Sequence, residues 1–241
     1  MTAADGVPIA VDCYSRGERR SALVVCPGFF KSKQTATFQR LSRALADGGV
    51  HDVLCMDFRG HGRSGGRYTF SAKEGADLEA VLAWARARYA HLGLLGFSLG
   101  AAIAINTVSR HPEGVRSLVA VSAPCAFEAI ECKWWMPEAI RRAIQGLRPG
   151  AGCRPGNPFL AKERPLERVG RMASVAVLFI HGTRDVIVDA RHSRRLYAAA
   201  AEPKRLLLIE GGSHAEALFR DEPQRFVELV SGWLAQTLKT D

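Results

Sequence analysis

Gly96-Phe97-Ser98-Leu99-Gly100 is the stretch that decides the fold expected for this chain of 241 residues. A short apolar run, residues 92–95, precedes it, and small apolar residues at 101–105 follow it. This pattern predicts a buried strand, a sharp turn and a buried helix, because glycines on both sides of the serine permit strained backbone and close packing of the helix. The turn would present the Ser98 hydroxyl at the positive end of the helix dipole. Ser98 is therefore a candidate nucleophile, and the alternative is a glycine-rich turn with an incidental serine.

The length and the hydrophobic content of 47% suit one large α/β domain with a sizeable core. No apolar run reaches the roughly 18 residues that a membrane span needs, and the first six residues lack the basic and apolar regions of a signal peptide. The six cysteines form no C-x-x-C motif, and no pair of them has metal-ligand spacing with histidines. Cys26 and Cys55 lie in apolar runs that are typical of reduced, buried thiols. We therefore expect a cytoplasmic protein without a membrane span.

The net charge of +9 suggests an anionic partner at first sight. The arginines, however, are spread over nearly the whole chain, without a basic stripe or a recognisable nucleic-acid-binding module. We expect no nucleic-acid partner.

Apolar runs with the length of strands alternate with patterns that have helical spacing. The expected strands cover residues 7–11, 22–26, 52–56, 92–95, 116–122, 174–180 and 205–209. The expected helices cover residues 37–47, 74–89, 99–110, 190–201 and 223–238. This alternation predicts an α/β fold, with a mostly parallel central sheet and helices on both faces.

The alternation stops between about residues 125 and 170, and this interval is longer than an ordinary loop. It contains Trp134, Trp135 and Met136, followed by a helix start at Pro137. We interpret it as a small cap inserted into a single domain that spans residues 1–241. The alternative is a packing elaboration whose tryptophans are simply buried.

A serine nucleophile needs a base, and the base needs an acid that orients it. Of the seven histidines, His214 is favoured because it follows the apolar run 206–209. That position lies at the carboxyl edge of the sheet, where the active sites of open α/β sheets collect; an exposed loop histidine is the alternative. His61 precedes the serine in the chain and has arginine neighbours that disfavour a charged imidazole. His181 ends a predicted strand.

The acid is best assigned to Asp185, in the loop after the predicted strand 174–180. Asp189 is its main competitor, although Asp189 could instead cap the helix that begins near Ala190.

Five motifs in order now carry a resemblance to a known family. They are Pro27-Gly28-Phe29-Phe30, Asp57-Phe58-Arg59-Gly60-His61-Gly62-Arg63-Ser64, Gly96-Phe97-Ser98-Leu99-Gly100, His181-Gly182-Thr183-Arg184-Asp185 and Gly212-Ser213-His214. Together they resemble an α/β-hydrolase-fold serine hydrolase. More narrowly, the chain is similar to small single-domain bacterial esterases of the serine aminopeptidase-like and feruloyl-esterase-like group. The resemblance extends from about residue 7 to residue 238, and the order serine, aspartate, histidine is that of the family's triad.

The resemblance implies acyl transfer, in which Ser98 attacks a carbonyl, His214 takes its proton and Asp185 fixes the imidazole tautomer. No metal or organic cofactor is needed for this chemistry.

The family's oxyanion hole maps onto the backbone N–H groups of Phe29 and Leu99, although Pro27 stands where the family usually has histidine. Phe30 and the cap residues Trp134, Trp135 and Met136 are the expected substrate contacts.

Three functions stay open at this point. The first is hydrolysis of a small or medium carboxylic ester, and the second is hydrolysis of an amide or peptide by the same triad. The third is a non-catalytic hydrolase-fold protein that binds a ligand, against which the intact triad argues. The expected partner is a small-molecule ester, and the sequence does not address the oligomeric state.

Overall fold

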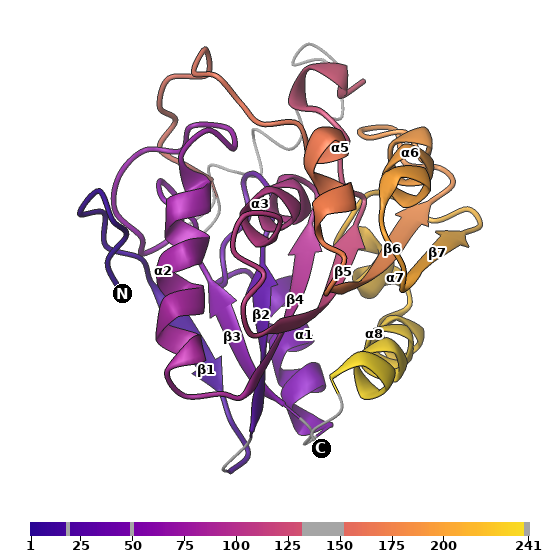
Figure 1. The fold of residues 1–241 in the computed structure, drawn as a ribbon, viewed down its shortest axis with the longest axis horizontal. Helices are drawn as coiled ribbons and strands as arrows, with labels where there is room; N and C mark the ends of the chain where they lie inside the picture. Colours follow the sequence, from indigo (N-terminus) through magenta and orange to yellow (C-terminus); the bar gives the residue numbers. More distant parts are fainter. Residues whose placement is uncertain (18–19, 49–50, 132–151, 239–241) are drawn as a thin grey trace.

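The computed structural model describes residues 1–17, 20–48, 51–131 and 152–238. Within them, a seven-stranded sheet has the order β1-β3-β2-β4-β5-β6-β7 (Figure 1). β1 pairs antiparallel with β3, and the other neighbours pair in parallel. The strands are β1 (Val11–Tyr14), β2 (Ser21–Cys26), β3 (Asp52–Met56), β4 (His91–Phe97), β5 (Val115–Val121), β6 (Ala176–Gly182) and β7 (Lys204–Ile209). This is the mostly parallel sheet that the alternation predicts.

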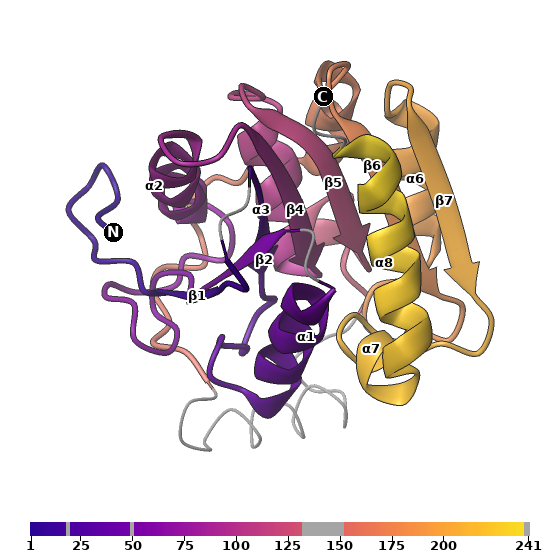
Figure 2. The same cartoon turned by 90° about the horizontal axis from the view of Figure 1, so that it is seen from below.

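Helices cover both faces of the sheet. The helices are α1 (Ala36–Asp47), α2 (Glu74–Arg86), α3 (Leu99–Val108), α5 (Pro165–Arg168), α6 (Arg191–Ala199), α7 (Ala217–Asp221) and α8 (Pro223–Thr237). Two short 3-10 turns are η1 (Phe127–Ala129) and η2 (Val169–Arg171). α2, α3, α5 and α6 lie on one face, and α1, α7 and α8 lie on the other (Figures 1 and 2). In the described part of the chain, no helix combines the length and the hydropathy that a membrane crossing requires.

The two faces of the sheet each carry a hydrophobic core. Val24 and Leu94 pack on the side of α2 and α3, whereas their neighbours Val25 and Leu95 pack on the side of α1 and α8. Successive strand residues point to opposite faces, so a strand buried on both sides needs apolar residues without alternation. This is why the inner strands are readable from the sequence as continuous apolar runs.

The first expected strand is wrong in its position. Residues 7–11 were expected to form it, but β1 begins only at Val11. The residues before it form a tight N-terminal turn, in which the Ile9 N–H donates to the Met1 carbonyl at 2.7 Å and Pro8 bridges Thr2. These local hydrogen bonds replace the ladder bonds that a longer strand would make.

Helix α3 lies directly against the strands that precede it. A Cβ at Gly96 would lie 2.5 Å from the Cα of Ala101, and one at Gly100 would lie 2.3 Å from the carbonyl oxygen of Cys26. Neither position has room for a side chain, so the glycines on both sides of Ser98 allow the helix to pack where it does.

The interval read as a cap lies only partly within the described residues. Trp134, Trp135 and Met136 fall in 132–151, outside them, and the division into one domain with a cap stays a prediction. The chain that follows is held against the body of the fold, because the Arg154 N–H donates to the Gly60 carbonyl at 2.7 Å.

The packing of α3 generates a stability prediction. Gly100→Ala should destabilise the protein by at least about 1–3 kcal/mol, because its Cβ would overlap backbone atoms that cannot move away cheaply. The matched control is Gly232→Ala in α8, where an added Cβ meets nothing within 4 Å. That change should stabilise the protein by about 0.5–1 kcal/mol through helix propensity. Urea unfolding of both variants tests the pair, and equal effects of the two changes would contradict the packing argument.

Candidate active site

The structure brings Ser98, His214 and Asp185 together at the carboxyl edge of the sheet. The His214 Nε2 lies 3.0 Å from the Ser98 Oγ, and the His214 Nδ1 lies 2.6 Å from the Asp185 Oδ2. His214 lies 116 positions after Ser98 and 29 positions after Asp185 in the sequence. The three residues come from the segments after β4, β6 and β7. All three are buried, with at most 8% of their surface exposed. The contacts form one continuous line from carboxylate to imidazole to hydroxyl.

Ser98 occupies a strained turn. Its φ of 52° and ψ of −121° lie in a region that non-glycine residues rarely adopt. The Ser98 N–H donates to the Val121 carbonyl at 2.8 Å, and the Ser98 carbonyl accepts the N–H of Ala101 at 3.0 Å. The surrounding backbone therefore fixes a conformation that lifts the hydroxyl out of the chain toward His214.

Asp185 is held as an ionised acceptor. Its Oδ1 accepts the backbone N–H groups of Ile187 and Val188, both at 3.0 Å. Burial alone would raise the pKa of Asp185, but hydrogen bonds from His181 and His214 outweigh it and hold the pKa well below its usual range. An ionised carboxylate at this position requires that His214 carry its proton on Nδ1, which leaves Nε2 free to accept from Ser98.

The competing acid, Asp189, lies in a different environment. It is exposed, and its Oδ1 accepts the Arg191 N–H at 2.8 Å at the start of α6. In the described part of the chain it makes no contact with His214. The geometry therefore favours Asp185, whose chemical role stays a prediction.

Two backbone N–H groups near the serine have no hydrogen-bond partner among the described residues. They belong to Phe29 and Leu99, the pair predicted as anion donors. Leu99 is the first residue of α3, where an N–H has no partner within the helix. The Phe29 N–H follows Gly28, which packs closely on the serine turn. A Cβ at Gly28 would lie 2.9 Å from the Phe97 carbonyl oxygen. Both donors thus lie beside Ser98.

His181 also contacts the Asp185 carboxylate, a role that the sequence did not predict. Its Nε2 lies 2.8 Å from the Val188 carbonyl oxygen and 3.3 Å from the Asp185 Oδ2, and its Nδ1 lies 2.6 Å from the Ser193 Oγ. A neutral imidazole with its proton on Nε2 satisfies all of these partners. The signal available in the sequence was its place at the end of a strand, four positions before Asp185.

The loop that carries His214 is tied to its surroundings by two further residues that the sequence reading missed. The Ser122 Oγ accepts the Ala215 N–H at 3.0 Å. Glu216, which is buried, pairs with Lys31 at 2.9 Å, so the segment after β2 is linked to the segment after β7. Burial would raise the pKa of Glu216, but Lys31 and His214 lower it. Neither contact follows from local sequence, because the partners are far apart along the chain.

Aromatic side chains gather beside the Phe29 backbone. The Phe30 ring centroid lies 3.9 Å from that of Phe29, which also stacks on Tyr68 at 5.2 Å. Phe70 and Phe127 continue the group. We call these five residues the aromatic cluster; only Phe30 among them was predicted to contact a ligand through its side chain. Among the described residues, no group of three or more histidine, cysteine or acidic side chains is arranged to hold a metal ion.

A family model described as alpha/beta hydrolase fold matches residues 21–154. The chain is 30% identical over 209 residues to the uncharacterized protein Rv2307c of Mycobacterium tuberculosis, covering 83% of this chain and 65% of that protein. It is 27% identical over 171 residues to the uncharacterized protein YfhR of Escherichia coli, covering 69% and 54%. The chain therefore spans about two thirds of the one relative and about half of the other.

Solved structures share the fold over nearly the whole chain. An esterase of Pyrococcus furiosus, Pf2001, superposes with a TM-score of 0.80 at 23% identity, covering 99% of this chain and 91% of that one. The esterase RhEst1 of a Rhodococcus species gives a TM-score of 0.79 at 20% identity, covering 98% of both chains. At these identities, the likeness shows the fold.

The short contact between Asp185 and His214 generates a spectroscopic prediction. The Nδ1 proton of His214 should resonate far downfield in the ¹H NMR spectrum, because it lies in a short hydrogen bond to a buried carboxylate. Asp185→Asn should remove this resonance, whereas the matched change Asp189→Asn should leave it in place. Its persistence in Asp185→Asn would mean that another group orients His214.

Proposed function

The chain belongs to the alpha/beta hydrolase fold family, and we propose that it is a serine hydrolase that cleaves a small or medium carboxylic ester. The observation that carries this proposal is the unbroken line of hydrogen bonds from Asp185 through His214 to Ser98 at a strained strand-to-helix turn. That arrangement is the one that nucleophilic acyl transfer requires: nucleophile, base and orienting acid in contact.

In the first half of the reaction, the Ser98 Oγ attacks the ester carbonyl carbon while His214 Nε2 takes the hydroxyl proton. The Asp185 carboxylate stabilises the imidazolium that forms and remains ionised itself. The tetrahedral intermediate then collapses, its bond to the alcohol oxygen breaks, and His214 returns the proton to the leaving alcohol. The acyl group is left as an ester on Ser98.

In the second half, a water molecule attacks the acyl-enzyme and His214 Nε2 takes one of its protons. When the second tetrahedral intermediate collapses, the proton passes to the Ser98 oxygen and the carboxylic acid is released. The enzyme returns to its starting state without a cofactor.

The negative charge that develops on the carbonyl oxygen needs donors that are already in place. The N–H groups of Phe29 and Leu99 would supply them, together with the positive end of the α3 dipole. We refer to residues 27–30 as the oxyanion loop. Loss of one such donor lowers kcat by about 10² to 10³.

Similar structures support an ester as the substrate. Pf2001 and RhEst1 are named as esterases, and the related structure Est1E of Butyrivibrio proteoclasticus is described with ferulic acid bound. The aromatic cluster beside the oxyanion loop would suit an apolar or aryl substituent.

We propose that Phe30 and the cap residues Trp134, Trp135 and Met136 set the preference among esters. A panel of p-nitrophenyl esters of increasing acyl length, run beside aryl esters and aminoacyl amides, separates ester from amide hydrolysis.

The assignment of the nucleophile makes a direct prediction. Ser98→Ala should fold normally and lower kcat by at least about 10³-fold, because the covalent step is lost. A fluorophosphonate probe should label the wild-type protein on Ser98 and should not label the variant. If Ser98→Ala retained more than a few per cent of kcat with contaminating esterase excluded, the nucleophile would have to be another residue.

The assignment of Asp185 as the orienting acid makes a second prediction, which concerns kcat. Asp185→Asn should lower kcat by about 10⁴-fold with little change in KM, because the imidazole loses both its tautomer and its stabilising charge. Asp189→Asn, which changes an exposed carboxylate four positions away, should stay within a few-fold of wild type. The reverse result would transfer the acid's role to Asp189.

A further inference from the structure

We propose that His61 is a positioning residue for the oxyanion loop. Its imidazole accepts the Phe30 N–H and so keeps the peptide that carries the Phe29 N–H beside Ser98. The inference rests on the proposed function, because it names the group that sets one of the two oxyanion donors. His61 lies in the turn that follows β3, and none of the acyl-transfer steps described above uses it.

The hydrogen bonds of His61 fix its tautomer. The Nδ1 lies 3.2 Å from the Arg59 carbonyl oxygen, so it carries the proton, and the Nε2 is left to accept the Phe30 N–H at 3.2 Å. Only 1% of His61 is exposed. Burial lowers the pKa of His61 to about 4, and the nearby Arg154 guanidinium acts in the same direction, whereas the bond to Arg59 opposes it. The imidazole is therefore a neutral acceptor near neutral pH.

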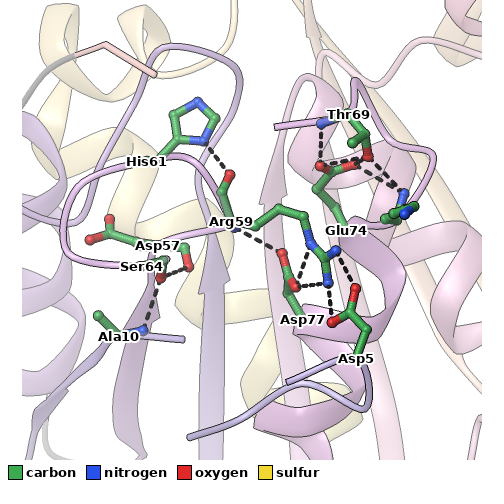
Figure 3. A network of polar contacts seen from close by, with 10 residues as sticks. Asp5, Ala10, Asp57, Arg59, His61, Ser64, Thr69, Glu74 and Asp77 are labelled. Carbon is green, nitrogen blue, oxygen red and sulfur yellow. Dashed lines mark hydrogen bonds and ion pairs between the residues drawn. The ribbon is translucent and has the colours of Figure 1, made fainter. Parts of the chain in front are cut away.

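The carbonyl that accepts the hydrogen bond from the His61 Nδ1–H belongs to Arg59, whose side chain is itself held in place. The Arg59 guanidinium lies 2.6 Å from the Asp77 Oδ1 on α2 and 2.6 Å from the Asp5 Oδ2 in the N-terminal turn (Figure 3). The Arg59 N–H also donates to the Asp77 Oδ2 at 2.8 Å. Two carboxylates from separate segments thus hold the backbone from which His61 is oriented.

The oxyanion loop needs such support because its backbone is strained. Phe30 has a φ of 60°, which non-glycine residues rarely adopt and which persists only where neighbours enforce it. A second contact holds the chain three residues later, where the Lys33 N–H donates to the Asp57 Oδ1 at 2.8 Å. Asp57 and His61 lie in the same turn, residues 57–64, so one turn fixes the loop at two points.

A role as proton carrier does not fit this environment. Both ring nitrogens of His61 are engaged by backbone groups, and in the described part of the chain neither contacts Ser98. The ring also packs edge-on against Tyr68, with centroids 4.5 Å apart. Packing and hydrogen bonding can be separated, because phenylalanine keeps the ring without the acceptor and glutamine keeps an acceptor near the position of Nε2.

The test compares His61→Phe with His61→Gln on a p-nitrophenyl ester. His61→Phe should lower kcat by about 10-fold or more, up to the 10² to 10³ that loss of an oxyanion donor costs, with KM nearly unchanged. His61→Gln should recover most of this loss. The matched control is His111→Phe, at an exposed histidine just beyond α3, which should behave as wild type.

A second measurement tests the stabilisation of the oxyanion separately from the other steps of the reaction. A trifluoromethyl ketone, whose adduct with Ser98 carries the charge of the tetrahedral intermediate, should bind His61→Phe more weakly by the factor lost in kcat. Affinity for the uncharged alcohol analogue should not change. Wild-type kcat and wild-type ketone affinity in His61→Phe would overturn the inference while leaving the proposed function intact. A wild-type protein that hydrolyses no ester and takes no fluorophosphonate label would instead overturn the proposed function, and this inference with it.

One measurement does not depend on a variant that folds. In ¹⁵N NMR of the wild-type protein, His61 should show protonated Nδ1 and unprotonated Nε2 between about pH 5 and pH 8. An Nε2-protonated ring or an imidazolium in that range would leave no acceptor for the Phe30 N–H and would overturn the proposal.

Discussion

The close packing of α3 on the ends of β2 and β4 is the constraint on which the candidate site depends. The helix begins immediately after the strand, so Ser98 adopts a φ of 52°, and the positions two residues before and after it, Gly96 and Gly100, have no room for a side chain. The first N–H of the helix has no partner within the helix, and the same closeness places the oxyanion loop on the serine turn. A serine in a looser connection would not have its hydroxyl held toward His214 next to the Phe29 N–H. The strain at this turn is thus a direct consequence of helix packing.

Parallel pairing explains why residues so far apart in the sequence meet. In a parallel sheet all strands end at one edge, and the segments that follow them collect there. The oxyanion loop follows β2, the turn with His61 follows β3, Ser98 follows β4, and Asp185 and His214 follow β6 and β7. Contacts between these segments, such as that between Lys31 and Glu216, then hold neighbouring connections in fixed relation. The sheet supplies proximity, and polar contacts between loops supply the final geometry.

The inner strands and the three residues that meet at the candidate site could be predicted from the sequence because their signals are local. Continuous apolar runs mark strands buried on both faces, and reactive residue types stand just after such runs. The first strand was misplaced because Pro8 and its neighbours make local hydrogen bonds that compete with the sheet. The roles of His181 and Glu216 were not predictable, since each depends on a partner brought close only by the fold. The contacts of the predicted cap residues lie outside the described structure.

Of the four histidines that are buried in the described chain, His61, His181 and His214 show that their partners, and not the residue type, separate their chemical roles. A base in acyl transfer must reach the nucleophile and must have a carboxylate to stabilise its charged form. His214 meets both conditions, with Ser98 on one nitrogen and Asp185 on the other. His181 has the carboxylate but lies behind it, with no contact to the serine in the described chain. His61 has only a backbone donor and a backbone acceptor, so protonating it would remove the acceptor on which Phe30 depends. The pattern of partners therefore leaves one histidine able to carry the proton and two that hold the groups around it.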